Sequence, residues 1–159
     1  MLNALAKKMA ISMDSGRASL VALAQSGAVR AEDVERLRRG FFAGRAPTRD
    51  EADAIFAIEA SGAHKCAEWT SFFVETLTEY VVWQARPTGI VNESQGEWLI
   101  RKADGAASLN ALALLVNVLA EALRIPLWFV AAVRTRARIG WDGVDVAQLM
   151  NDVGLAEAA

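Results

Sequence analysis

Arginines and tryptophans near the end of the chain are its best candidates for binding chemistry. Arg134 and Arg138 are four residues apart, so they share one face of a helix, and Trp141 follows them. Guanidinium groups bind phosphates and carboxylates, and an indole ring can stack on such a partner. We therefore predict a binding site at Arg134, Arg138 and Trp141. The alternative is that the arginines only complement the negative end of a helix dipole.

Two further tryptophans are candidates for a contact surface, because five are many for a chain of this length. Trp83 is expected at a helix end beside Pro87, and Trp128 follows Pro126, so neither is expected to be fully buried. Tryptophan is enriched at the energetic centres of protein interfaces. We predict that Trp83 and Trp128 contribute to a surface for a protein partner or for a second copy of the chain, with filling of the core as the alternative.

Carboxylates at helical spacing offer a different kind of site. Glu59, His64, Glu68 and the acidic run around Asp50 have residue types that bind a divalent metal or a polar ligand. The chain has only one histidine, which excludes a di-iron centre built from two Glu-x-x-His motifs. We assign no metal ligands, and ligand or metal binding stays an alternative.

Catalytic motifs are harder to find. His64 and Cys66 are two positions apart, so on a helix they would point in different directions, which disfavours a thiolate–imidazole pair. Neither phosphate-binding pattern, G-x-x-x-x-G-K-[ST] or G-x-G-x-x-G, occurs. We predict no catalytic residue and no cofactor, and the sequence favours a protein that is not an enzyme.

Composition is typical of a globular, bacterial-type cytoplasmic protein. With 53% hydrophobic and 23% charged residues, the chain is far from the disordered class. A net charge of -2 argues against general nucleic-acid binding, and a single cysteine fits a reducing cytoplasm. The apolar stretch 109–133 contains Glu121 and Arg124 and is interrupted by Pro126, so we expect two short buried helices and no membrane span.

Apolar residues recur at helical spacing almost throughout, which predicts an all-α bundle of about seven or eight helices in one domain, residues 1–159. Residues 1–16 are expected to include a loosely docked N-terminal helix that ends before Asp14, Ser15 and Gly16. Residues 154–159 are expected to form a frayed tail. The other helices are expected at about 15–27, 31–44, 48–60, 65–84, 92–104, 108–123, 126–138 and 144–153.

Capping residues mark several of these helix starts. Thr48 and Glu51 have the spacing of a capping box, in which each side chain binds the backbone N–H of the other residue. Asn92 and Ser108 are expected to cap the helices that follow them.

Two helix entries share a pattern of a glycine, a capping residue and an acidic or amide residue. The copies are Gly44, Pro47, Thr48, Glu51 and Gly89, Val91, Asn92, Gln95. Over the central half of the chain, this pattern resembles the second half of an EF-hand loop. The resemblance implies a pair of helix–loop–helix units that do not bind calcium, because loop positions 1, 3 and 5 before Gly89 are Gln84, Arg86 and Thr88, and Gln95 replaces the bidentate glutamate.

Taken together, these features predict a non-enzymatic helical interaction or scaffold module with an apolar surface that contains tryptophan. Its partner would be another protein or a second copy, giving a homodimer. The alternative is a stress-type protein that binds a ligand or a divalent metal through helical carboxylates.

Overall fold

The computed structural model describes residues 2–144 and 147, and this part of the chain is mostly helical, which confirms the all-α prediction. The predicted helix 144–153 and the predicted tail 154–159 lie essentially outside the described residues. The helices are α1 (Leu2–Ser26), α2 (Ala31–Arg36), α3 (Arg49–Ala60), α4 (Ala67–Thr78), α5 (Glu93–Ala106), α6 (Leu109–Glu121) and α7 (Leu127–Ile139). The π-helical segments η1 (Leu37–Phe41) and η2 (Glu79–Gln84) continue α2 and α4, and two short strands are β1 (Ala28–Val29) and β2 (His64–Lys65).

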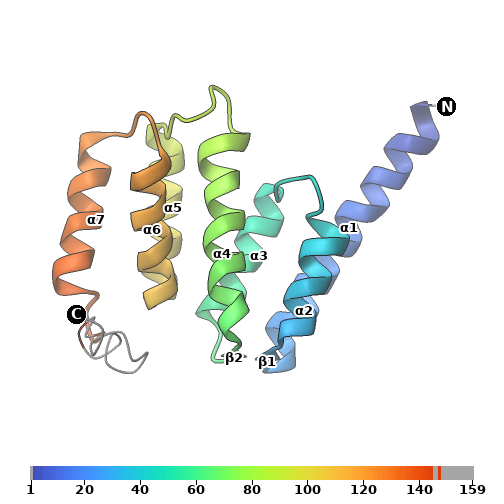
Figure 1. Cartoon of the computed structure of the whole chain (residues 1–159), viewed down its shortest axis with the longest axis horizontal. Coiled ribbons are helices and arrows are strands. Elements are labelled where there is room, and N and C mark those ends of the chain that lie inside the picture. Colours follow the sequence, from blue (N-terminus) through green and yellow to red (C-terminus); the bar gives the residue numbers. More distant parts are fainter. Residues whose placement is uncertain (1, 145–146, 148–159) are drawn as a thin grey trace.

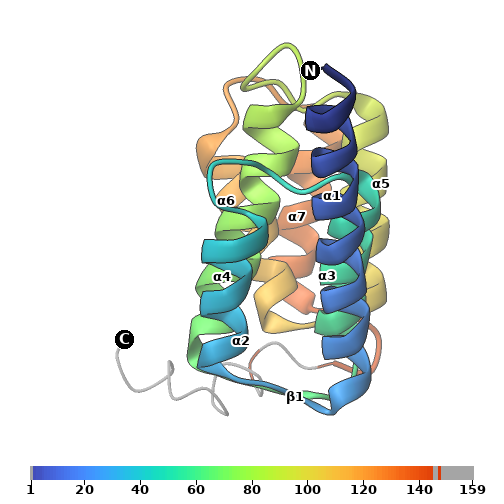
Figure 2. The same cartoon turned by 90° about the vertical axis from the view of Figure 1, so that its right-hand side faces the viewer.

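The helices form two layers. Successive helices alternate in direction, so α1, α3 and α5 run one way in one layer while α2, α4 and α6 run the other way in the second layer (Figures 1 and 2). Helix α7 packs on α5 and α6 at one end of the array. As a consequence, α4 and α6 are parallel neighbours within one layer.

Pairs of loops are hydrogen-bonded at opposite ends of the array. At one end β1 pairs in parallel with β2, and at the other Ile90 bridges to Arg124. Gly89 suits the second pairing, because its φ is +79° and a Cβ atom there would lie 2.8 Å from a Leu123 side-chain carbon. Of the two loops that carry the EF-hand resemblance, the Gly89 loop joins such a pairing, whereas that at Gly44 does not within the described chain.

The predicted caps are confirmed. Thr48 and Glu51 form a complete capping box at the start of α3, and Asn92 forms another with Gln95 at the start of α5. The Ser108 side chain accepts a hydrogen bond from the backbone N–H of Ala111 at the start of α6. The starts of α3, α5 and α6 are therefore set by local sequence signals.

The predicted break near Gly16 is wrong, because α1 continues through it to Ser26. Gly16 is buried, and a Cβ atom at this position would lie 3.1 Å from Oε2 of Glu51. The glycine is thus explained by a close approach of α1 to the side chains of α3, and not by a helix end. Towards the N-terminus, residues 3–8 are exposed and α1 extends past its neighbours (Figure 1).

One core cluster draws residues from α1 to α7. Its largest fully buried side chains include Trp69, Phe72, Phe73 and Phe129. The rings of Trp69 and Phe72 are 5.5 Å apart, and those of Phe56 and Phe73 are 5.3 Å apart in an edge-to-face contact. Helix α4 supplies three of these aromatics, so its inner face is anchored in the core and its other face is left for a surface feature.

Candidate functional site

An open groove of about 1020 Å³ lies between the parallel helices α4 and α6, and we call it the α4–α6 groove. Its lining is mainly apolar along most of its length and polar at the end where both helices begin. The apolar and small lining residues are Ala67, Thr70 and Val74 of α4 and Leu109, Leu112, Ala113, Val116 and Ala120 of α6.

Helix α6 is apolar on nearly all sides, so the wall that it contributes to the groove is apolar. One face packs Ala111, Leu114, Leu115 and Val118 into the core. On the opposite face Val116 is 48% exposed in the middle of the groove. A helix that is apolar all round is normally covered all round. The sequence predicts a buried helix over 109–123 and does not locate the groove, although the apolar character on all sides of this helix is its signal.

A buried polar cluster lies at the polar end of the groove. Glu59 is 6% exposed, and its Oε2 accepts hydrogen bonds from Trp69 Nε1 at 2.6 Å and from Asn110 Nδ2 at 3.3 Å. Asn110 Oδ1 in turn accepts a hydrogen bond from Thr70 Oγ1 at 2.9 Å. This cluster ties the end of α3 to the beginnings of α4 and α6, and it holds the Glu59 carboxylate at the groove wall.

Lys65 and Cys66 line the same end of the groove. Burial raises the pKa of the Cys66 thiol, and the adjacent Glu68 carboxylate raises it further, so the thiol is a poor nucleophile at neutral pH. His64 is exposed in β2, while Cys66 is the N-cap of α4, so the two residues do not share a helix. This end of the groove is suited to binding rather than to thiol chemistry.

The predicted site residue Trp83 lies beyond the other end of the groove. Its indole Nε1 donates a hydrogen bond to Glu121 Oε2 at 2.8 Å, and Asn117, which lines the groove, donates to Glu121 Oε1 at 3.2 Å. Trp83 is 37% exposed, so part of its ring is open to a partner. Among the predicted site residues, Trp83 is the one linked to the groove, through the hydrogen bonds of Glu121 and Asn117.

The remaining predicted site residues lie on α7 or directly after it. Trp141 donates a hydrogen bond to Asp104 Oδ1 at 2.7 Å, and Arg136 binds the same carboxylate through Nε and Nη2 at 2.6 and 2.7 Å. Arg134 and Arg138 are exposed. Trp141 and Arg136 therefore bind the same carboxylate, that of Asp104. Their N–H donors are used within the chain and are not free for an anionic partner.

Trp128 also turns its polar group inward. Its indole N–H donates a hydrogen bond to Glu93 of α5, while 37% of the residue's surface is exposed.

The carboxylate of Asp104 is stabilised in its charged form. Burial alone would raise the pKa of Asp104, but the hydrogen bonds from Arg136 and Trp141 and the charge of Arg136 outweigh burial and lower this pKa. Both tryptophans of the α7 region thus bind carboxylates of α5 and fasten α7 to it.

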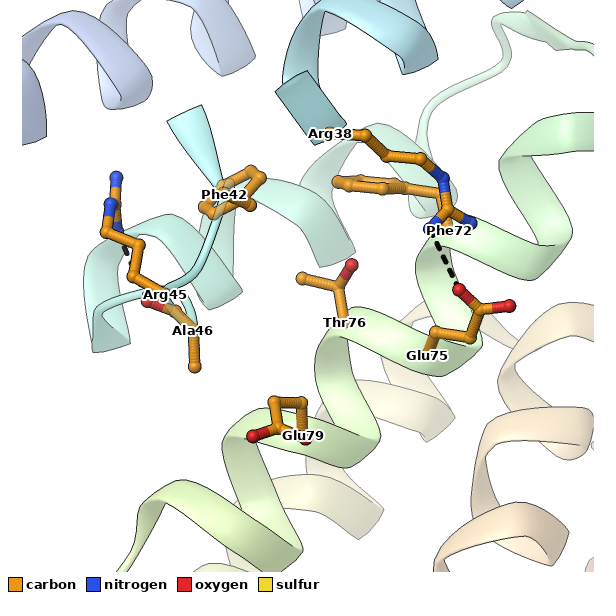
Figure 3. A pocket seen from close by; sticks show the side chains of 8 residues that line it. All are labelled: Arg38, Phe42, Arg45, Ala46, Phe72, Glu75, Thr76 and Glu79. Carbon is orange, nitrogen blue, oxygen red and sulfur yellow. Dashed lines mark hydrogen bonds and ion pairs between the residues drawn. The ribbon is translucent and has the colours of Figure 1, made fainter. Parts of the chain in front are cut away.

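A second, smaller cavity of about 280 Å³ lies between the loop after η1 and α4 (Figure 3). Arg38 binds Glu75 at 2.8 Å on its wall and lies over the Phe72 ring, 5.7 Å from the ring centre. Arg45 lies 5.1 Å from the centre of the Phe42 ring in the same way. The chain's own arginines already cover the aromatic faces and bind one carboxylate, so this cavity offers less to a ligand than the α4–α6 groove.

The carboxylates of the metal-binding alternative are dispersed. Glu59 is engaged in the polar cluster, and Asp50 lies 3.9 Å from Arg17. Within residues 2–144 and 147, no three side chains of His, Cys, Asp or Glu come together in a way that could hold a metal ion.

No helix of the described chain has the length and apolar character needed to cross a membrane. Comparison with protein-family models, with curated proteins and with solved structures gave no match for the sequence or the fold.

Proposed function

We propose that this chain is a non-enzymatic interaction module that binds an amphipathic helix of a partner protein in the α4–α6 groove. The observation that carries the proposal is the outer face of α6, where Val116 is 48% exposed in a helix with apolar residues on all sides. Covering such a face with an apolar partner removes its area from water, which is the main driving force of association.

The shape of the groove suits a helix. It lies between two parallel helices, and Ala67, Thr70, Ala113 and Ala120 give it small walls. Helices pack with their axes about 8–10 Å apart, and small residues at the contact favour the shorter distances. A partner helix with apolar residues at positions i, i+3 or i+4, and i+7 would place them along this surface.

The charges of the groove support an apolar protein partner. Glu59 and Lys65 are the only charged residues in the described part of the chain that line it, so these residues form no basic stripe for a nucleic acid. In this proposal the surface is α4 and α6, with Trp83 at its border, and not the α7 residues Trp128 and Trp141. We place the module in the cytoplasm, where the lone Cys66 would stay reduced.

Photo-crosslinking in native cells tests the proposal. A photoreactive amino acid is placed at Val116 in the groove and, as a matched control, at Val21 on α1, which is 44% exposed. We expect one partner protein to be crosslinked at Val116 and not at Val21. The crosslinked segment should be an amphipathic helix that also binds the purified chain.

Three other results would contradict the proposal. A crosslink between two copies, with a dimer mass in native mass spectrometry, would make the chain a homodimer through this face. An adduct within one chain to residues 145–159 would assign the groove to the chain's own C-terminal segment. Equal crosslinking at Val116 and Val21 would show that the groove is not a specific surface.

A further inference from the structure

Two glutamates of the described chain are buried, and they differ in their ionic partners. Glu51 is 1% exposed and is bound by Arg45, with an Nη2–Oε2 distance of 2.9 Å. Glu59 is 6% exposed, yet no Lys, Arg or His of the described residues lies within 4.0 Å of its carboxylate. Charges that are taken out of water are normally paired. The Glu59 carboxylate is therefore short of a cation.

The two oxygens of Glu59 are used unequally. Oε2 accepts both hydrogen bonds, from Trp69 and Asn110. Oε1 accepts none from the described residues, and no buried polar side-chain atom among them is left without a partner. Oε1 is therefore not fully buried, and Glu59 lines the α4–α6 groove. An ionised carboxylate can only accept hydrogen bonds, so a group that binds Oε1 must be a donor.

Lys65 is close in sequence but is not this donor. Its Nζ donates hydrogen bonds to the backbone carbonyl oxygens of Ser61 at 3.1 Å and Ala63 at 3.0 Å. These contacts hold the ammonium group at the turn before α4. Lys65 therefore does not pair with Glu59, which has no cationic partner among the described residues.

We infer that the occupant of the groove carries an ammonium or guanidinium group that binds Oε1 of Glu59, on a stem that lies against Leu112, Ala113 and Val116. The inference rests on the proposed function, because it names the chemistry of the same partner: an amphipathic helix with one Lys or Arg at the end of its apolar stripe. Charged hydrogen bonds in a partly dry site are stronger than neutral ones, so Glu59 gives the groove its selectivity.

A series of eight-carbon probes isolates this contact. n-Octylamine, n-octanol and n-octanoate have the same apolar stem and differ in the head group. Their affinities for the purified chain at pH 7 are measured by isothermal titration calorimetry. We expect n-octylamine to bind at least about tenfold more tightly than the other two, the factor expected for one charge-assisted hydrogen bond.

Three variants show which residue causes the preference. Glu59→Gln keeps the shape of the side chain and should bring n-octylamine to the affinity of n-octanol. Asp50→Asn, which removes an exposed carboxylate outside the groove, should leave the amine preference unchanged. Lys65→Met removes the other charge of the groove and should not weaken the binding of n-octylamine. If Glu59→Gln does not fold, Lys65→Met and the three probes on the unaltered chain still test the inference.

The outcomes separate the inference from the proposed function. Equal binding of all three probes would overturn the Glu59 contact and leave the groove standing as an apolar surface. Tightest binding of n-octanoate, lost in Lys65→Met, would overturn it in favour of an anionic partner. If no probe binds, both the cation contact and the groove as a binding surface are wrong.

Discussion

At the scale of single residues, indole–carboxylate hydrogen bonds are the recurring device of this fold. All five tryptophans donate their indole N–H to a carboxylate of another element, which satisfies the one polar group of a large apolar side chain. Trp83 and Trp128 are open only at the ring, so their polar atoms are committed within the chain. The pairs are Trp69–Glu59, Trp83–Glu121, Trp98–Asp53, Trp128–Glu93 and Trp141–Asp104.

Asp104 makes one of these contacts testable through pH. Because its pKa is lowered in the folded chain, its contribution to stability is complete above the ordinary aspartate pKa of about 3.9 and is lost as the pH falls through the lower folded value. We expect Asp104→Asn to reduce the free energy of unfolding at pH 7 by about 1 kcal/mol, kept small by solvent exposure.

Chemical denaturation at several pH values measures this effect. The difference between the unaltered chain and Asp104→Asn should shrink as the pH falls below about 4, where the wild-type carboxylate is also neutralised. The neighbouring exposed Asp142→Asn serves as the control and should have little effect. A difference that is constant from pH 7 to pH 3 would contradict the role given to the Asp104 charge.

These pairs show what residue patterns can and cannot predict. The partial exposure of Trp83 and Trp128 was expected from their places beside prolines. Their carboxylate partners were not predicted, because the paired residues are 10 to 45 positions apart and meet only through packing of the helices. The same reason explains why Trp141 was grouped with Arg134 and Arg138, its neighbours in sequence, when Arg136 and Asp104 are its neighbours in space.

At the scale of elements, local signals were reliable wherever the backbone itself supplies the partner. Thr48, Asn92 and Ser108 start their helices as predicted, because capping needs only groups within three residues. Gly16 was read as a helix end by the same local logic and is instead a packing position within α1. The physical cause, the carboxylate of Glu51, lies in another helix and has no trace in the sequence near Gly16.

Gly16→Ala tests this account of α1. Alanine is the better helix former by up to about 1 kcal/mol. Nevertheless, we expect Gly16→Ala to lower the free energy of unfolding by about 1 kcal/mol. The new Cβ would press on Glu51 Oε2, and Arg45 and Thr48 fix that carboxylate with hydrogen bonds of 2.9–3.0 Å.

Gly105→Ala is the matched control, since a Cβ atom at Gly105 in α5 meets nothing within 4 Å. It should be neutral or stabilising in the same denaturation experiment. If Gly16→Ala also stabilises the chain, α1 does not approach Glu51 as closely as described.

At the scale of the whole molecule, the two-layer arrangement produces the candidate site. Alternating helix directions place α4 and α6 in parallel, and the outer face of α6 is left without a covering element among the described residues (Figure 2). The sequence predicted the helices and an apolar interaction surface. It could not locate the groove, because an apolar stretch such as 109–123 looks the same whether one or both of its faces are covered.

The affinity of the partner segment identified by crosslinking at Val116 tests the central claim most directly. Isothermal titration should show that Val116→Glu weakens binding at least about tenfold, because a carboxylate would be buried against apolar groups, while the matched Val21→Glu binds like the unaltered chain. Both variants should keep their melting temperature, since both positions are partly exposed. Unchanged affinity in Val116→Glu, or an equal loss in Val21→Glu, would contradict the assignment of the α4–α6 groove as the binding surface.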